Sequence, residues 1–266
     1  IILGIALGFM RNSSSSHTIE SAGGLFETFQ KIIDWAMYGL PFGLLCLIAA
    51  QIASVGVDIL VVMMRFIAIF YITGLLIIVL NSILIWKRSG EKFSTVFRAI
   101  REPIIVALAT RSSFATIPAA INSLENNLSF DKTSVNLYVP LGTTICRYGN
   151  ILFFGLGTLF VAQLYGTNLG FSGYLVALVG CVLAGIATTG ASGILTLPMI
   201  GIILEPLGLP LETIIIIFIA IDPIIDPMRT LLIVHTNMAT ASFISERQKN
   251  VEAEPPLETV QQPIKS

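Results

Sequence analysis

The stretch IDPIIDPMRT, at positions 221–230, lies in a strongly apolar region and contains three ionisable side chains within a span of eight residues. Asp222 and Asp226 are four residues apart and Arg229 follows three residues later, so a helix would carry all three on one face. At membrane depth each charged side chain costs about 2.5–3.5 kcal/mol on insertion scales. Two interpretations fit this spacing. Either the charges neutralise one another and join helices, or they line a polar site for a charged solute.

The composition predicts an all-α integral membrane protein. The 266 residues are 55% hydrophobic and 12% charged, and the mean hydropathy is +0.86. A soluble domain carries roughly twice that share of charge. The apolar residues come in blocks bounded by short polar segments, the pattern of several membrane helices. A net charge of −1 argues against nucleic acid as a partner, and three scattered cysteines indicate neither a disulfide framework nor a metal cluster.

Two segments are expected to form re-entrant hairpins. Residues 103–121, PIIVALATRSSFATIPAAI, contain two short apolar arms around a polar tip. Neither arm is long enough to cross a hydrocarbon layer of about 30 Å. Residues 174–204 contain a second such unit, whose tip runs from Thr188 to Gly193. Paired interrupted segments of this kind indicate the midplane binding site of a transporter.

The remaining segments give the expected organisation of the chain. The apolar start, IILGIALGFM, has no basic segment before it, so we expect part of a helix of a longer protein rather than a signal peptide. Lys and Arg cluster between 87 and 101 and near 247–249, which predicts that the base of the first hairpin and the C-terminus are cytoplasmic. The expected elements are partial scaffold helices in 1–54, a transport domain in 55–245 (helix 56–86, first hairpin 93–125, broken helix 135–164 interrupted at 146–150, second hairpin 174–208, last helix 211–245) and a disordered tail in 246–266.

Four motifs resemble the sodium:dicarboxylate symporters, the family of glutamate and neutral amino-acid transporters. ATRSSFATIP looks like the family's serine-rich first hairpin, VPLGTTI like the lead-in to its broken helix, GLPLE like the turn after its second hairpin, and DPIIDPMRT like its last helix. The resemblance covers residues 1–245 and implies that the family's first helices are absent from this chain. It implies a glutamate-transporter-like fold with two re-entrant helical hairpins in an inverted repeat, an elevator-like movement, and a homotrimer among the lipids of a plasma or inner cell membrane.

The same resemblance implies roles for individual residues. Arg229 would hold a carboxylate of an acidic substrate through two parallel hydrogen bonds, and Asp226 would take an amino group. Ser112 and Ser113 would offer donors to the α-carboxylate. The implied substrate-binding set is Ser112, Ser113, Thr116, Asp226, Arg229, Thr230 and Ile233. The implied gate at the second hairpin tip is Thr188, Thr189, Gly190, Ala191, Ser192 and Gly193.

The chain departs from the family pattern where the family binds sodium. The family's Asn-Met-Asp-Gly-Thr is replaced by CRYGN, its carboxylate-binding Asn aligns with Ile233, and its sodium-binding Asp aligns with Asn237. Sodium prefers oxygen ligands, so we expect a weaker sodium site, with Arg147 as a fixed cation in place of the coupling ion. The alternative is that Arg147 only bridges helices. The coupling-ion region so defined is Cys146, Arg147, Tyr148, Gly149, Asn150, Asp222 and Asn237.

These observations predict a secondary active transporter, a symporter, for acidic amino acids or dicarboxylates, with no cofactor except a coupling ion. That ion is Na⁺ or H⁺, and the lost acids favour protons, exchange or weak sodium dependence. His235 either relays protons or is packed in the fold. One alternative is a family member that no longer transports. Another is an intramembrane hydrolase built on Asp222 and Asp226, but the adjacent Arg229 balances their charge, and we predict no enzyme activity.

Overall fold

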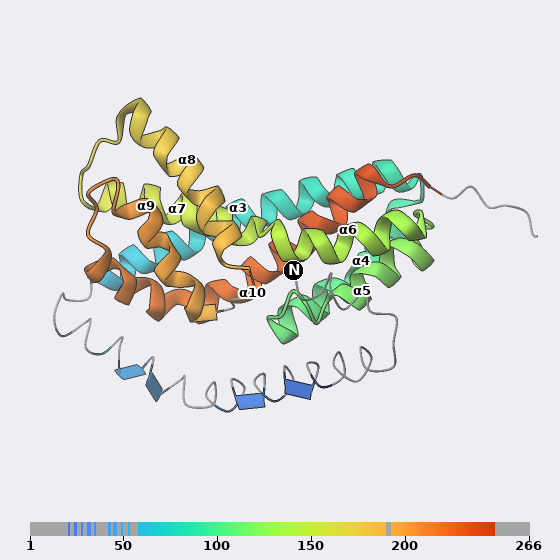
Figure 1. Cartoon of the computed structure of the whole chain (residues 1–266), viewed down its shortest axis with the longest axis horizontal. Coiled ribbons are helices and arrows are strands. Elements are labelled where there is room, and N and C mark those ends of the chain that lie inside the picture. The colour runs from blue at the N-terminus through green and yellow to red at the C-terminus, as the bar shows by residue number, and fades with distance from the viewer. Residues whose placement is uncertain are drawn as a thin grey trace, which may run out of the picture. The chain divides into compact units, whose positions relative to one another are not determined.

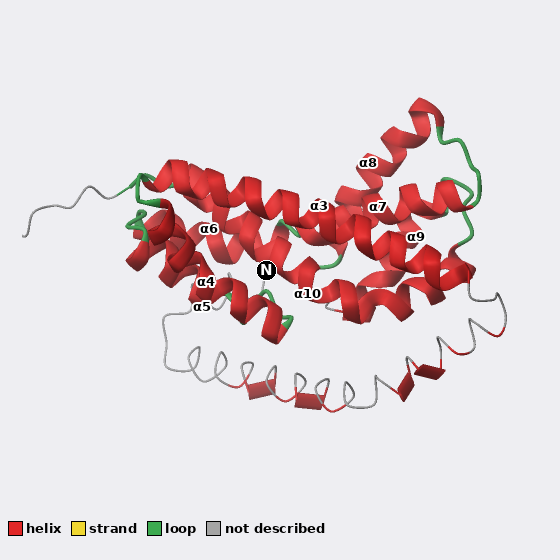
Figure 2. Ribbon diagram, turned by 180° about the vertical axis from the view of Figure 1, so that it is seen from behind, coloured by secondary structure: helices red, strands yellow, loops and turns green. Residues whose placement is uncertain are grey.

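The computed structural model describes residues 58–189 and 193–247, together with separate helical positions between 21 and 53. Within these described residues the secondary structure is helical, apart from one antiparallel bridge between Phe130 and Arg247 (Figure 2). The chain divides into two compact units, 1–60 and 61–266. The expected scaffold helices of 1–54 and most of the expected tail lie outside the described residues.

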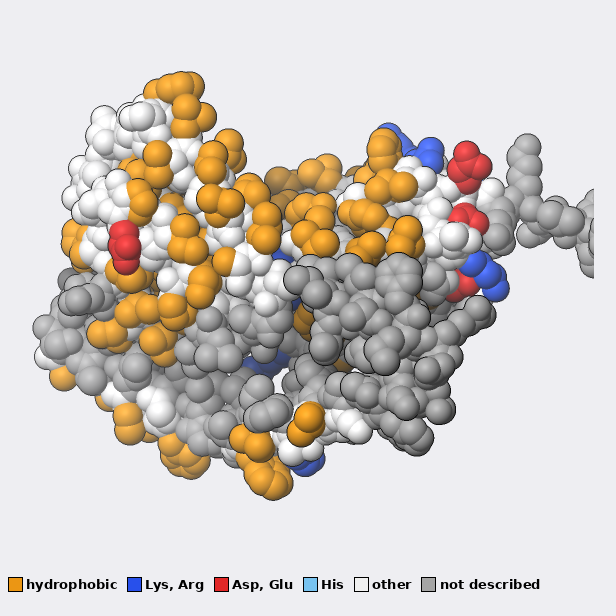
Figure 3. Space-filling model, in the orientation of Figure 1, with side chains coloured by type: hydrophobic (Ala, Val, Ile, Leu, Met, Phe, Trp, Pro, Cys, Tyr) orange, Lys and Arg blue, Asp and Glu red, His pale blue; other side chains and the backbone are white. Residues whose placement is uncertain are grey.

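Three helical stretches are long and apolar enough to cross a membrane, judged by length and composition: Val61–Ser89, Lys132–Leu164 and Gly170–Ala187. Large apolar side chains are exposed along these stretches, for example Met64 at 70% and Leu178 at 64%. In Figure 3 hydrophobic side chains spread over the part of the surface formed by the helix α8, Gly170–Ala187, while charged side chains gather mainly at the opposite end. An apolar surface of this extent fits a lipid environment and confirms the prediction of a helical membrane protein.

Two long helices, α3 (Asp58–Ser89) and α10 (Leu211–Ile244), run side by side through the second unit (Figure 1). Polar contacts join them along their length: Asn81 donates to the Thr236 hydroxyl at 2.9 Å, and Ser82 lies 3.2 Å from the His235 ring. At their common end the Arg88 guanidinium of α3 donates to main-chain carbonyls near the end of α10. His235 is therefore packed between the two helices rather than exposed to lipid.

The first hairpin consists of α4 (Phe93–Thr110), α5 (Ile117–Asn122) and the π-helical turn Ser123–Asn127. Its first arm is 18 residues long, because the helix includes the polar and basic residues that precede the apolar segment starting at 103. The helix continues through Pro103, which has no N–H to give to the Ala99 carbonyl. The hydroxyl of Ser123 donates to that carbonyl instead, at 2.8 Å and in a buried position. This side-chain bond replaces the missing main-chain bond and lets α4 extend past the proline.

The broken helix consists of α6 (Lys132–Ile145) and α7 (Tyr148–Leu164). It begins three residues before the expected position 135, because Asp131 caps the first turn by accepting from the Ser134 N–H at 2.8 Å. Only Cys146 and Arg147 have non-helical backbone angles. The other three residues of the expected interruption, 148–150, form the first turn of α7, so the break is narrower than the sequence indicated.

The second hairpin consists of α8, the 3₁₀ helix Gly193–Ile200 and α9 (Gly201–Leu204). The returning segment packs on α8, and α8 packs on α7. A buried aromatic cluster from α3, α7 and α10 lies beneath these helices, with ring centroids 5.3–5.9 Å apart between Phe66, Phe153 and Phe218. Phe153 of this cluster also contacts the Arg229 guanidinium of α10.

Candidate functional site

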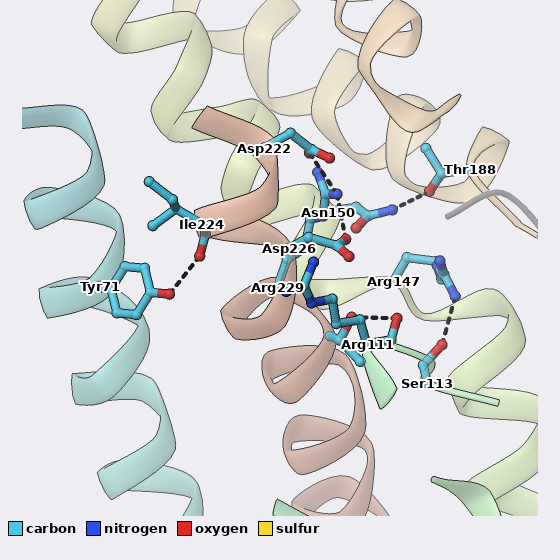
Figure 4. Close-up of polar contacts among 11 residues, drawn as sticks. Tyr71, Arg111, Ser113, Arg147, Asn150, Thr188, Asp222, Ile224, Asp226 and Arg229 are labelled. Atoms are coloured by element: carbon cyan, nitrogen blue, oxygen red, sulfur yellow. Dashed lines mark hydrogen bonds and ion pairs between the residues drawn. The ribbon is translucent and has the colours of Figure 1, made fainter. Parts of the chain in front are cut away.

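The three charged residues of α10 form a buried cluster within one helix. Nη2 of Arg229 lies 2.9 Å from Oδ1 of Asp222 and 2.7 Å from Oδ1 of Asp226. Arg229 is 2% exposed, and the aspartates are 2% and 8% exposed. The predicted common face is therefore present, and both carboxylates converge on a single nitrogen of the guanidinium (Figure 4).

The position of this cluster argues against a role in joining helices. All three side chains belong to α10, so their ion pairs connect no second element. Burying ionised groups in a low-dielectric interior costs more than an intrahelical ion pair returns. The contact to a neighbouring helix is the face of Phe153 in α7, whose ring centroid lies 5.2 Å from the guanidinium carbon of Arg229. Nη1 of Arg229 is buried and has no hydrogen-bond partner among the described residues.

Two prolines shape the backbone around the cluster. Pro223 and Pro227 lie inside α10 and cannot donate to the carbonyls four residues before them. The Tyr71 hydroxyl of α3 donates to the Ile224 carbonyl at 2.6 Å, on the opposite side of α10 from the Arg147 side chain (Figure 4). The charged segment is thus a stretch of helix with fewer internal hydrogen bonds than its neighbours.

The break between α6 and α7 brings a second buried arginine to the site. Arg147 is 4% exposed, and its Nη1 donates to the Ser113 hydroxyl at the tip of the first hairpin, at 3.0 Å. Its guanidinium carbon lies 5.9 Å from the Phe114 ring centroid. Arg147 is close enough to Arg229 to be repelled by it and close enough to Asp226 to be attracted. The predicted fixed cation therefore lies beside the α10 cluster, next to the hairpin tip.

The tip of the second hairpin contacts the same break from another side. The Asn150 side-chain amide donates to the Thr188 hydroxyl at 2.6 Å, and that hydroxyl donates to the Gly185 carbonyl at 2.6 Å. Thr189 donates to the Thr144 carbonyl at 3.2 Å. Of the expected gate, Gly190, Ala191 and Ser192 lie outside the described residues, and Gly193 begins the 3₁₀ helix.

Other expected substrate residues have different surroundings. Ser112 and Thr116 bond within the first tip, where the Thr116 hydroxyl donates to the Ser112 carbonyl at 2.8 Å. Thr230 donates to the Arg111 carbonyl at 3.3 Å and so ties α10 to that tip. Ile233 is buried and apolar. The structure therefore brings Ser113, but not the Ser112 side chain, to a buried cation.

The remaining residues of the expected coupling-ion region surround the break. Asn237 donates to the Cys146 carbonyl at 3.1 Å and to the Ile233 carbonyl at 2.8 Å, and its buried Oδ1 has no partner among the described residues. Tyr148 is half-buried in the first turn of α7. No group of three or more His, Cys, Asp or Glu side chains suitable for a metal ion occurs in the described part of the chain.

Gly149 explains how α7 and α10 approach so closely. A Cβ atom at this position would lie 2.0 Å from the Arg229 carbonyl oxygen, which no substitution of a side chain elsewhere can relieve. The first turn of α7 therefore rests directly on the backbone of the charged residue. This contact fixes the distance between the break and the α10 cluster.

Three residues at the site were missed by the sequence analysis. Arg111 follows α4 with φ of 53°, a left-handed conformation, and its carbonyl holds Thr230. Its charge within an otherwise apolar segment was the available signal. Phe153 and Tyr71 gave no signal, because an aromatic residue in an apolar run predicts packing and nothing more specific.

Comparison with known proteins identifies relatives for nearly the whole chain. Residues 1–247 match the family described as "Sodium:dicarboxylate symporter family". The chain is 31% identical over 236 residues to "Excitatory amino acid transporter 2" of Mus musculus, covering 86% of this chain and 40% of that protein. It is 31% identical over 211 residues to an "Excitatory amino acid transporter" of Caenorhabditis elegans, covering 77% of this chain and 41% of that protein. The chain thus spans less than half the length of these relatives.

Proposed function

Because this chain belongs to the sodium:dicarboxylate symporter family, we propose that it forms the solute-binding part of a secondary active transporter for acidic amino acids or dicarboxylates. The observation that carries the proposal is the buried Arg229, whose Nη1 has no hydrogen-bond partner among the described residues. A planar guanidinium suits the two oxygens of a carboxylate, and a buried one binds it strongly because water does not compete. The names of the relatives, which refer to amino-acid transport, support the same class of solute.

In the proposed mechanism a carboxylate of the solute binds Nη1 of Arg229, while the aspartates bond Nη2. Asp222 and Asp226 both bond Nη2, so an anion can approach the Nη1 side without first separating both ion pairs. The Ser113 hydroxyl, which accepts from Arg147, is the proposed contact from the first hairpin tip. Thr230 keeps the first tip against α10 while the solute is held.

The second hairpin tip supplies the proposed gate. The Asn150–Thr188 hydrogen bond holds this tip over the break, beside the arginines (Figure 4). Lifting the tip requires that bond and the Thr189–Thr144 contact to separate, and both are single neutral hydrogen bonds of about 1 kcal/mol. Such contacts are strong enough to close a site and weak enough to open on each cycle. We also propose that the base of the first hairpin and the C-terminus lie in the cytoplasm. The proposed assembly is a homotrimer.

For the coupling ion we propose protons, exchange, or weak sodium dependence. By the resemblance, the family's two sodium-binding acids align with Tyr148 and Asn237, which are both neutral. Arg147 already provides a buried positive charge beside Asp226. A site with a resident cation and few anionic oxygens is a poor host for sodium. Solute uptake into proteoliposomes that disappears without sodium would contradict this part of the proposal.

The direct test is ligand-induced thermal stabilisation of the full-length protein in detergent. A solute that binds only the folded state raises the unfolding temperature by mass action. We expect glutamate, aspartate or succinate to stabilise the unaltered protein, and Arg229→Ala to reduce the affinity about 100-fold or more, as truncation of one partner of a buried charge pair does. Arg65→Ala is the matched control, because Arg65 is an exposed arginine on α3. Normal stabilisation of Arg229→Ala by all three acids would refute the proposed pocket.

A second candidate function is a family member that no longer transports. The occupied Nη2 of Arg229 and the amide at Asn237 favour it, since both reduce the charge available to solute and ion. It predicts no uptake of any acidic solute by proteoliposomes, with or without sodium and at any pH between about 5 and 8. Accumulation of one acid above the background of empty liposomes would exclude it.

A further inference from the structure

The end of the second unit where α3 ends and α4 begins carries a group of exposed cations. Charged side chains gather at this end of the molecule (Figure 3). Four of them are lysines and arginines between positions 87 and 101, and all four are exposed: Lys87, Lys92, Arg98 and Arg101. None of the four has an ion-pair partner among the described residues. Their positive charges therefore face outward without a compensating acid.

The neighbouring charges at this end are already used within the fold. The Arg88 guanidinium donates to main-chain carbonyls near the end of α10, and Arg247 pairs with Glu91. The acid of α4 is Glu102, which is also exposed. The exposed charges of 87–102 are thus four cations and one acid, and this surface is suited to an anionic partner.

Three exposed aromatic rings lie beside the cations. Trp86 of α3 is 39% exposed, and Phe93 and Phe97 of α4 are 52% and 60% exposed. The ring centroids of Trp86 and Phe93 are 5.7 Å apart, and those of Phe93 and Phe97 are 6.5 Å apart. The Trp86 indole N–H donates to the Glu91 carbonyl at 3.0 Å, which fixes the start of this row. Aromatic rings of this kind are enriched at the boundary between a membrane and water.

The face of α4 that carries Phe97 continues into an apolar surface. Phe97, Arg101 and Ile105 follow one another at intervals of four residues, and Leu108 comes three residues later, so all share one side of the helix. Ile105 is 51% exposed and Leu108 is 42% exposed. At about 1.5 Å per residue, Leu108 lies roughly 10 Å along the helix from Arg101. The face therefore passes from cations and aromatic rings to bare apolar side chains.

We infer that this face binds an anionic phospholipid of the adjoining leaflet. The headgroup contacts a basic–aromatic surface that consists of Trp86, Lys92, Phe93, Phe97, Arg98 and Arg101. Guanidinium and ammonium groups are the usual protein partners of a phosphate oxygen. An acyl chain lies along Ile105 and Leu108. An acidic protein segment would match the cations, but it would leave these apolar residues uncovered.

The inference does not depend on which solute binds at Arg229. It requires only that α3 and α4 meet the membrane surface at this end. In the proposed orientation this surface belongs to the cytoplasmic leaflet, the one that carries anionic lipids, and each basic residue close to it strengthens binding about fivefold.

Trp86 serves as the reporter in the test. The chain contains two tryptophans, so Trp35→Phe leaves Trp86 as the single fluorophore of the full-length protein. This protein is reconstituted in phosphatidylcholine vesicles that contain an equal share of brominated phosphatidylglycerol or brominated phosphatidylcholine, because bromine quenches a tryptophan that it contacts. We expect the apparent affinity for phosphatidylglycerol to be about fivefold higher or more. Raising the salt from about 0.1 M to 1 M should remove most of this preference, since the Debye length falls from about 10 Å to 3 Å.

Variants at exposed positions assign the preference to the surface. Arg98→Gln together with Arg101→Gln is expected to reduce the preference for phosphatidylglycerol to less than about twofold, because each cation accounts for about fivefold. Glu102→Gln is expected to increase it, since an acid that repels the headgroup is removed. Arg65→Gln is the matched control, because Arg65 is an exposed arginine near the opposite end of α3. It should leave the preference unchanged.

Three results would overturn the inference. One is equal quenching by the two brominated lipids at low salt when Trp35→Phe is the only change. Another is a preference that survives in Arg98→Gln with Arg101→Gln. The third is tight binding of an acidic peptide, poly-glutamate, in detergent together with equal quenching by the two lipids, which would assign the surface to a protein partner. The proposed function is tested separately, by the ligand affinity of Arg229→Ala.

Discussion

The middle and the end of α10 each involve an arginine, which is buried in the middle and exposed at the end. In the middle, Arg229 bonds two carboxylates of its own helix and so joins no other element. At the end, Arg88 reaches across from α3 and donates to the carbonyls of Ser242 at 3.3 Å and Phe243 at 3.0 Å. A cation at the C-terminal end of a helix satisfies free carbonyls and the helix dipole. The comparison shows that Arg88 joins α3 to α10, whereas the ion pairs of Arg229 lie within one helix and join no second element.

The largest expected effect comes from removing the acids of the middle region. Asp222→Asn together with Asp226→Asn leaves Arg229 buried without a compensating carboxylate. We expect the free energy of unfolding to fall by about 3–5 kcal/mol, the usual cost of an uncompensated buried charge. Thermal unfolding in detergent measures the change. Because the variant has lost its internal anions, added succinate is expected to restore part of the stability.

Unfolding of this double variant at the same temperature as the unaltered protein would contradict the comparison. That result would mean that water or another group already balances Arg229. The matched control is Glu205→Gln, since Glu205 is an exposed acid at the end of α9. It is expected to change the free energy of unfolding by less than about 0.5 kcal/mol, as most surface substitutions do.

Gly149→Ala tests the contact that sets the middle region in place. The added Cβ would lie 2.0 Å from the Arg229 carbonyl oxygen, so α7 and α10 must separate. We expect a loss of about 3 kcal/mol, at the upper end of the range for overpacking a tight interior. Thermal unfolding again gives the measurement, and ligand affinity should fall as well, because the break moves away from Arg229.

Gly155→Ala is the control for this substitution within the same helix. A Cβ at position 155 would meet Cys181 Sγ at 3.8 Å, an ordinary contact distance. Alanine has a higher helix propensity than glycine by about 1 kcal/mol, so this variant is expected to be as stable as the original or slightly more stable. If both alanine variants behave alike, the close approach of Gly149 has no energetic importance.

Arg88→Ala sharpens the comparison from the other end of α10. Its loss leaves carbonyls of the last turn without a donor and separates the ends of α3 and α10. The expected destabilisation is about 1 kcal/mol, typical of a cation at a helix C-terminus. Affinity for acidic solutes should remain unchanged, because Arg88 touches none of the residues of the site. A large change of affinity in this variant would erase the distinction between the two regions.

The smallest expected effect is that of Ser123→Ala. The Ser123 hydroxyl donates to the Ala99 carbonyl that Pro103 leaves without a donor. It therefore satisfies a free carbonyl of α4 as Arg88 does for α10, but without a charge. Side-chain hydrogen bonds between membrane helices contribute about 0.6 kcal/mol on average, and we expect a loss of that size. Ser94→Ala, at an exposed position of α4, is the control and should not change the unfolding temperature.

Periodicity and residue type predicted the parts of the site that are local in sequence. The spacing of Asp222, Asp226 and Arg229 predicted their common face, and their mutual bonds follow from it. The interruption near CRYGN was visible as polar residues and a glycine inside an apolar helix, although the backbone break is limited to Cys146 and Arg147. Such features depend on neighbours within two turns, which one sequence displays.

Contacts between distant segments escaped the sequence. The bond from Arg147 to Ser113 spans 34 residues, and that from Asn150 to Thr188 spans 38. Their existence depends on how the hairpins pack on the broken helix, which no local pattern specifies. The bond that supports α4 at Pro103 is likewise distant, since the Ser123 hydroxyl comes from 24 residues beyond the carbonyl it serves.

The close contact between Gly149 and the main chain of α10 also has a consequence for the proposed transport function. At Gly149 the backbones of α7 and α10 are in direct contact, so rotation of side chains cannot let one helix slide along the other. The two helices are therefore expected to move together. If the proposed function holds, a solute bound at Arg229 would move together with α7 and α10 as one unit. The movement of the proposed transport cycle would then take place outside the contact between these two helices.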